Sequence, residues 1–332
     1  MKFGPVPVAA AEGAILAHSV GLPDGRLRKG KALEPADLER LAMAGLTEVI
    51  AARPEPGDVT EDRAAERLAR AILPDPDGAG LRLGRATTGR VNIHATGSGI
   101  LGLDTAAIDR LNRINPALTL ATLPPYARLE DRTLVATVKI ITYAAPEADV
   151  AAAEALGGQG LLQRHAPVRR TARLIETTVP GQTIGAKGRA ATKARLDRFG
   201  VSLGPREIIP HEVGALAQAL TASSADIVLI LTGSATSDPL DVGPAALRRA
   251  GGTLTRFGMP VDPGNLLLVG QLRGVPVIGL PGCARSVALN GADWVLDRLL
   301  CGVEVSDADI AAMGIGGLLK EPPSRPRPRE AK

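Results

Sequence analysis

The stretch Ile227–Asp241, IVLILTGSATSDPLD, decides the fold prediction, because five consecutive aliphatic residues run directly into a loop of small polar residues. A short apolar run that ends in Gly and Ser is typical of a strand buried on both faces. The segment Pro244–Arg249 is then predicted to be a helix. A strand, a Gly/Ser/Thr loop and a helix in this order can present backbone N–H groups to an anion, most naturally a phosphate.

A second segment, VPVIGLPGCARS at residues 275–286, repeats this order. Its predicted strand ends in a Gly-Leu-Pro-Gly turn, and we expect a helix from there to Leu300. Strands are also predicted at Thr171–Thr178 and Val201–Ile209, and helices at Lys187–Phe199 and Glu212–Ala222. Alternating strands and helices indicate a mostly parallel sheet, here in a three-layer α/β/α domain. Ligands bind beyond the carboxyl ends of such strands, so we expect the two loops side by side at one sheet edge.

The 332 residues are enough for about two domains, and turn-rich segments suggest where sections begin and end. Segment Pro74–Gly78 is the clearest break in the first half. We predict four sections: a smaller N-terminal α+β section at 1–76, a β-rich accessory section and linker at 77–162, the α/β domain at 163–320, and a basic Pro/Arg tail at 321–332.

Composition excludes several classes of protein. Only 2% of residues are aromatic, which argues against a base-stacking platform for nucleic acid, and the net charge of +4 is small. No apolar run approaches the roughly 18 residues of a membrane span. Two cysteines without a Cys/His cluster argue against zinc and against a disulfide framework. We therefore expect a cytoplasmic protein that binds neither nucleic acid nor membrane.

Polar residues in and near the two loops are the candidate functional groups. Asp238 and Asp241 can hold Mg²⁺ against phosphate oxygens, or they can cap the following helix, and both interpretations stay open. Arg285 can supply a positive charge to a phosphate. The turn-rich corner around Asp262 can cover the binding site expected between the two loops, or it can be a plain turn. Cys283 is interpreted as a structural thiol, because no histidine stands near it in the sequence.

Three segments together resemble the molybdopterin-binding domain of molybdenum cofactor biosynthesis proteins. They are TGSATSDPLD (232–241), MPVDPGN (259–265) and GLPGCARS (279–286), and they are most similar to those of the molybdopterin molybdenumtransferases. The resemblance implies an enzyme that inserts molybdate into adenylylated molybdopterin with Mg²⁺ and loss of AMP, in a homodimer. It implies catalytic and metal-binding roles for Asp238 and Asp241. The residues implied to bind molybdopterin, or its adenylylated form, are Thr232, Gly233, Ser234, Thr236, Asp262, Pro263, Gly264, Gly279, Pro281, Gly282, Arg285 and Ser286.

The sequence also departs from the family pattern. Ser234 and Asp238 stand where the family has glycines, and Cys283-Ala284 replaces Asn-Pro. Segment Gly181–Gly188 lacks the aspartate that the family has after its first strand. Two alternatives therefore stay beside molybdate insertion. One is a non-catalytic molybdopterin carrier that serves a nucleotidyltransferase or a molybdoenzyme, and the other is a nucleotide pyrophosphatase or amidase on the same domain.

Overall fold

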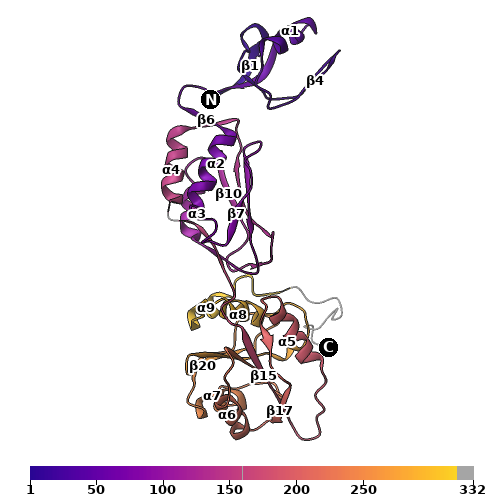
Figure 1. Ribbon diagram of the computed structural model, residues 1–332, viewed down its shortest axis with the longest axis vertical. Helices are drawn as coiled ribbons and strands as arrows, with labels where there is room; N and C mark the ends of the chain where they lie inside the picture. Colours follow the sequence, from indigo (N-terminus) through magenta and orange to yellow (C-terminus); the bar gives the residue numbers. More distant parts are fainter. Residues whose placement is uncertain (159, 320–332) are drawn as a thin grey trace. The chain divides into compact units, whose positions relative to one another are not determined.

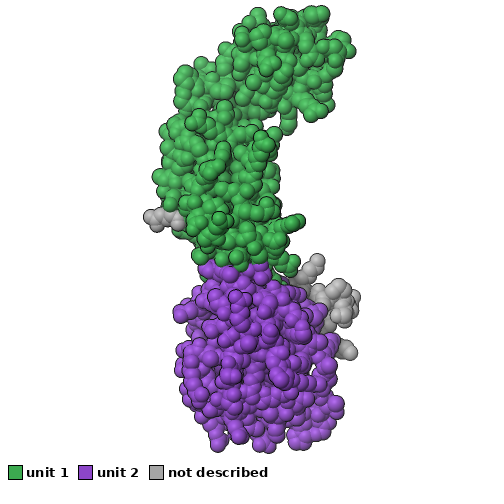
Figure 2. All heavy atoms as spheres, in the orientation of Figure 1, with its two compact units in different colours: residues 1–97, 101–164 green, residues 98–100, 165–332 purple. Residues whose placement is uncertain are grey.

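The computed structural model describes residues 1–158 and 160–319. The chain divides into two compact units, which are coloured separately in Figure 2. Unit 1 holds residues 1–97 and 101–164, and unit 2 holds residues 98–100 and the chain after residue 164. The predicted basic tail at 321–332 lies outside the described residues, and the predicted division into four sections stays a prediction. No helix in the described part of the chain combines the length and the apolar character that a membrane span needs.

The first part of unit 1 is a small sheet with its own core. Its strands β1 (Lys2–Pro7), β5 (Glu48–Arg53) and β2 (Ile15–Leu16) are antiparallel, in the order β1-β5-β2. Helix α1 (Pro35–Met43) begins with proline, and Glu34 and Asp37 form a capping box that satisfies its first N–H groups. Next to these elements are the short helix η1 (Val8–Ala10) and the hairpin β3 (Val20–Leu22) and β4 (Gly25–Leu27).

The second part of unit 1 contains a four-stranded sheet in the order β10-β12-β8-β7. Apolar residues recur along α2 at helical spacing and pack with the sheet and with α4 in one core, which includes Leu68, Ile72, Ile93, Val138 and Val150. The elements of this part are β6 (Asp58–Thr60), α2 (Glu61–Ile72), β7 (Leu81–Leu83), β8 (Arg90–Ala95), β9 (Gly99–Leu103), α3 (Thr105–Asn112), β10 (Leu118–Thr122), β11 (Arg128–Leu129), β12 (Leu134–Ile140), β13 (Ala144–Pro146), α4 (Glu147–Gly157) and β14 (Leu162–His165).

Unit 2 is built on one sheet that is parallel at its centre. Strands β16 (Ser202–Leu203) and β17 (Glu207–Pro210) both pair with β15 (Thr171–Thr178), and the order continues through β18 (Ile227–Leu231) to β21 (Val275–Gly279). All of these strands are parallel. Strands β20 (Leu268–Leu272) and β19 (Thr253–Phe257) extend the sheet in antiparallel fashion. The mixed α/β class and the mostly parallel sheet are therefore confirmed.

Alternate residues of the central strands belong to two different apolar clusters. One combines Leu229 and Leu231 with side chains of α5 (Lys187–Asp197), α8 (Gly291–Leu300) and α9 (Asp307–Ala312). The other combines Val228 and Ile230 with α6 (Val213–Thr221) and α7 (Val242–Arg249). Because successive residues of a strand point to opposite faces, the two helix sets pack on different faces of the sheet. Figure 1 shows α6 and α7 on one side of β15 and β20, and α5, α8 and α9 on the other.

Two local predictions in unit 2 are wrong. The segment predicted as one strand at Val201–Ile209 forms two short strands, separated at Gly204-Pro205. Proline lacks the N–H that a central strand donates, which explains the interruption. The helix expected directly after the second loop begins only at Gly291, because a 3₁₀ turn at Gly282–Arg285 and an irregular segment precede it.

Candidate functional site

The loops that follow β15, β18 and β21 meet at the carboxyl ends of these adjacent strands. They enclose a pocket of about 150 Å³. The structure therefore confirms that the two Gly-containing loops lie side by side. The pocket is lined by six predicted residues, Thr232, Gly233, Thr236, Pro281, Gly282 and Arg285, and by Gln182, Leu231, Ala235, Leu266 and Leu280.

Arg285 links the second loop to the first. Its Nη2 donates a hydrogen bond to the carbonyl oxygen of Thr232 at 2.8 Å. A methyl group added at Gly188, near the beginning of α5, would lie 3.3 Å from Nη1 of the same guanidinium. The arginine is thus held by a carbonyl and by close packing against α5, and its remaining N–H groups stay available to an anion.

Hydrogen bonds from β15 fix the first loop. The N–H of Gly233 donates to Oγ1 of Thr177 at 2.9 Å, and this hydroxyl is also hydrogen-bonded to Nδ1 of His211 at 2.8 Å. Nε2 of Gln182 donates to the Gly233 carbonyl at 3.1 Å. Only glycine fits here, because a Cβ at residue 233 would lie 2.7 Å from the Thr177 carbonyl oxygen. No sequence motif marks Thr177, Gln182 or His211 as site residues.

An ion pair between a buried glutamate and a partly exposed arginine holds the loop between β15 and α5. Glu176 is completely buried near the end of β15, and its Oε2 accepts a hydrogen bond from Nε of Arg206 at 2.9 Å. Nη2 of Arg206 also donates to the carbonyl oxygens of Ile184 and Gly185, at 2.9 and 3.0 Å. The other carboxylate oxygen, Oε1, has no hydrogen-bond partner among the described residues. The sequence signal for this pair is the polar run Glu176-Thr177-Thr178, which follows the apolar pair Leu174-Ile175 at the end of the strand.

Arg195 of α5 holds the second loop in place through an ion pair and several hydrogen bonds. Its side chain is 4% exposed and forms an ion pair of 2.7 Å with Asp293, which is 3% exposed. The guanidinium also donates to the carbonyl oxygens of Ala284, Ser286 and Ala288, at 2.9, 2.7 and 3.1 Å. The stretch 163–198 is rich in basic residues, a pattern typical of a pocket rim or a solvated helix face. Arg195 departs from this pattern, because it lies in the interior.

Asp238 and Asp241 both bind backbone groups of their own loop. Asp241 is the N-cap of α7, with Oδ1 accepting from the Val242 N–H at 2.7 Å and Oδ2 from the Ser237 N–H at 3.1 Å. Asp238 is exposed, and its Oδ1 accepts from the Leu240 N–H at 2.7 Å. Residues 1–158 and 160–319 contain no group of three or more His, Cys, Asp or Glu side chains that could hold a metal ion. The catalytic and metal-binding roles of the two aspartates stay predictions.

The corner at Met259–Asn265 packs against the beginning of α8. The Gly291 N–H donates to the Pro263 carbonyl at 2.9 Å, and a Cβ at Gly264 would lie 2.7 Å from the Gly291 nitrogen. The peptide bond between Asp262 and Pro263 is cis. The predicted site residues outside the pocket lining are Ser234, Asp238, Asp241, Asp262, Pro263, Gly264, Gly279 and Ser286. Their proposed binding roles stay predictions.

The Cys283 thiol lies in the 3₁₀ turn of the second loop and is partly exposed. Burial raises the pKa of this thiol, and the nearby carboxylates of Asp262 and Asp293 raise it further, against the opposing effect of Arg195. A raised pKa keeps the thiol protonated, so a nucleophilic thiolate is disfavoured. This agrees with its interpretation as a structural thiol.

Comparisons with known proteins found similarities mainly among solved structures. A family model described as a domain of unknown function, DUF8806, matches residues 5–53, which is only a short N-terminal part of the chain. A search of curated proteins found no significant match. Among solved structures, the chain is similar to a molybdopterin biosynthesis MoeA protein from Pyrococcus horikoshii, with 13% identity, 91% of this chain and 75% of that chain covered, and a TM-score of 0.32.

Two further structures are comparable. A molybdenum cofactor biosynthesis protein from Pyrococcus furiosus has 13% identity, 92% and 66% coverage and a TM-score of 0.25. A molybdopterin biosynthesis MoeA protein from Pyrococcus horikoshii OT3 has 11% identity, 91% and 76% coverage and a TM-score of 0.28. TM-scores of this size do not establish a shared fold, so the case for a function depends on the residues of the site itself.

Proposed function

We propose that unit 2 binds molybdopterin, or its adenylylated form, and that the protein acts in molybdenum cofactor biosynthesis, in Mg²⁺-dependent molybdate insertion. The observation that carries this proposal is the pocket in which Arg285 joins the two Gly-containing loops. The three segments that resemble a molybdopterin-binding domain contribute both of these loops and the corner beside them.

The pocket is large enough for one end of such a substrate but not for the whole molecule. Sites that enclose a whole drug-sized molecule span roughly 300–1,000 Å³, whereas this pocket has about 150 Å³. It is therefore suited to a phosphate or another small oxyanion, while the pterin extends over the sheet edge. Arg285 would bind the anion by charge, and Thr236 lines the same pocket. These residues would position the substrate without a covalent step.

The carboxylates of Asp238 and Asp241 fit a magnesium ion that is shared with substrate oxygens. Mg²⁺ is commonly bound by one or two carboxylates together with phosphates and water. Each carboxylate uses only some of its oxygen lone pairs to accept hydrogen bonds from backbone N–H groups. Its other lone pairs stay available to a metal ion. A bound Mg²⁺ would polarise the phosphoanhydride. The protein would contribute by holding the two carboxylates at the edge of the loop.

A non-catalytic carrier is the second candidate, and one observation favours it. Both aspartates already have structural roles as a helix cap and a turn, so their presence is explained without catalysis. We further propose the arrangement that accompanies either function: a three-layer α/β/α domain, in a cytoplasmic homodimer. The packing of α6 and α7 on one face of the sheet, with α5, α8 and α9 on the other, supports the three layers.

The two candidates are separated by titrating the full chain with molybdopterin, and then with adenylylated molybdopterin, Mg²⁺ and molybdate, while binding and AMP release are measured. Asp241→Asn is the informative variant, because asparagine can still cap the helix at the Val242 N–H. Of the two hydrogen bonds that Asp241 accepts, only the one from Ser237 is then lost. An insertion enzyme would release AMP, and Asp241→Asn would abolish this while stability and binding persist. A carrier would bind tightly without release in both forms.

Arg285→Ala is the matched test of the pocket. We expect it to weaken molybdopterin binding about tenfold or more, as the loss of a charge-assisted hydrogen bond does. Absence of binding to the wild-type chain would refute the proposal. Hydrolysis of nucleotides without molybdate insertion would indicate the pyrophosphatase instead.

A further inference from the structure

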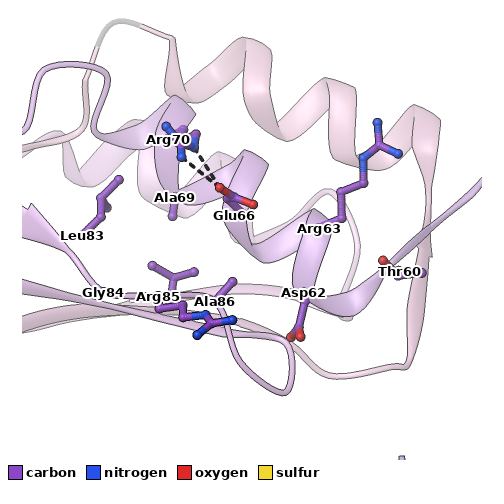
Figure 3. A pocket seen from close by; sticks show the side chains of 11 residues that line it. Thr60, Asp62, Arg63, Glu66, Ala69, Arg70, Leu83, Gly84, Arg85 and Ala86 are labelled. Atoms are coloured by element: carbon purple, nitrogen blue, oxygen red, sulfur yellow. Dashed lines mark hydrogen bonds and ion pairs between the residues drawn. The ribbon is translucent and has the colours of Figure 1, made fainter. Parts of the chain in front are cut away.

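A second and larger pocket lies in unit 1, between helix α2 and the segment that leaves strand β7. It has a volume of about 750 Å³, within the roughly 300–1,000 Å³ of small-molecule sites. Its lining is drawn in Figure 3 and consists of Thr60, Asp62, Arg63, Glu66, Ala69, Arg70, Leu83, Gly84, Arg85, Ala86 and Val91. None of these residues belongs to the site in unit 2. We propose that this pocket binds a small organic anion with an apolar body and a phosphate or carboxylate group.

The floor of the pocket is apolar. Ala69 and Val91 are 1% and 2% exposed and belong to the core of unit 1, and Leu83 and Ala86 pack against that core from the side. Small side chains dominate this floor, which leaves room for the body of a ligand. A flat or compact apolar group placed there would be removed from water on one side.

The charged wall has more positive than negative groups. The lining contains three arginines and two carboxylates, an excess of one positive charge. Arg70 donates to Glu66 at 2.9 Å, and Asp62 accepts from the Gly89 N–H at 2.6 Å. Arg85, by contrast, has no hydrogen bond or ion pair within residues 1–158 and 160–319.

Figure 3 shows Asp62, Glu66 and Arg70 on α2 and Arg85 on the opposite strand side. An unpaired guanidinium beside an apolar floor suits a carboxylate or phosphate, which its N–H groups can bind in bidentate geometry. The Asp62 carboxylate at the other end repels an anion, and so it favours a ligand with its charge at one end only.

The pocket is preformed, because both of its walls are fixed. The bond from Gly89 to Asp62 attaches the turn after Ala86 to the beginning of α2. Directly before Arg85 in the chain, the Gly84 N–H donates a hydrogen bond to the Asn92 carbonyl oxygen at 2.7 Å. A ligand therefore needs no rearrangement of the backbone to enter, which reduces the entropic cost of binding.

The test is calorimetric titration of the full chain with phenyl phosphate, benzoate and inorganic phosphate. Every titration uses the Arg285→Ala background, because the unit 2 pocket is itself suited to phosphate. We expect saturable binding of phenyl phosphate or benzoate, and binding of inorganic phosphate at least tenfold weaker. The difference between the two organic probes identifies which anionic group the pocket prefers. Arg85→Ala should weaken the organic probe about tenfold or more.

Arg90→Ala is the control, because Arg90 is an exposed arginine of the same hairpin that does not line the pocket. It should bind as the Arg285→Ala background alone does, and both variants leave the pocket of unit 2 untouched. Equal losses in the two variants would show general attraction to a basic surface and overturn the proposal. Failure of both organic probes to bind, or inorganic phosphate binding as tightly as phenyl phosphate, would overturn it as well.

Discussion

Replacing Arg195 by methionine removes the centre of the interior network beneath the second loop. The substitution keeps an unbranched side chain of similar length and deletes the guanidinium, which forms hydrogen bonds with Asp293 and with four carbonyl oxygens. Asp293 is 3% exposed, so its charge cannot be hydrated in place of the lost partner. The carbonyls of Ala284 and Ser286 lose donors at the same time.

The expected cost follows from this burial. Removing one partner of a buried ion pair destabilises a protein by about 3–5 kcal/mol, because the other charge is left uncompensated. The control is Lys193→Met on the same helix. Lys193 and Asp197 form an ion pair of similar length, 2.7 Å, but their side chains are 60% and 53% exposed. An exposed pair of this kind contributes about 1 kcal/mol or less.

Urea unfolding of the full chain provides the measurement. Trp294 is the only tryptophan of the sequence and lies in α8 next to Asp293, so its fluorescence reports on unit 2. We expect Arg195→Met to lower the free energy of unfolding by about 3 kcal/mol more than Lys193→Met does, as the two classes of ion pair differ. A difference below about 1 kcal/mol would refute the assignment of Arg195 as the residue that holds this loop.

Two further predictions concern unit 2. Backbone N–H groups of Arg170 and Thr171, at 2.8 and 2.9 Å, lower the pKa of Asp226 from its ordinary value. A lowered folded-state pKa contributes stability above about pH 4 that is lost as the pH falls through it. Urea titrations from pH 7 to pH 2 should therefore show Asp226→Asn less stable at pH 7 by about 1 kcal/mol, with the deficit vanishing in acid; a constant deficit would contradict this. Gly233→Ala places a Cβ 2.7 Å from the Thr177 carbonyl oxygen, so we expect weaker molybdopterin binding and a lower melting temperature, and unchanged values for both would refute the close packing.

Much of the local structure could be predicted from the sequence. Strand β15 begins and ends at the predicted residues, and helix α5 begins at the predicted Lys187. Apolar periodicity and turn residues act over a few positions, and so they are visible in the sequence alone. The adjacency of the two loops also followed, because parallel strands separated by helices place their carboxyl ends at one edge.

The pocket lining could be predicted only in part, because several of its supports come from distant segments. Thr177 and Gln182 come from β15 and its loop, about fifty positions before the Gly233 that they hold. The irregular segment before α8 is a similar case. Its carbonyls accept hydrogen bonds from Arg195, some ninety residues earlier, and no local propensity records this.

The sequence by itself therefore determined the α/β class of unit 2, the alternation of β15, β18 and β21 with helices, and the two loops at the sheet edge. Only the tertiary structure decided that Arg195 is buried, that Glu176 pairs with Arg206, and that Arg85 stays unpaired beside an apolar floor. The physical reason is that a charged side chain has the same local propensity whether it faces water or a partner. Its environment is set by elements that are far away in the chain and adjacent only after folding.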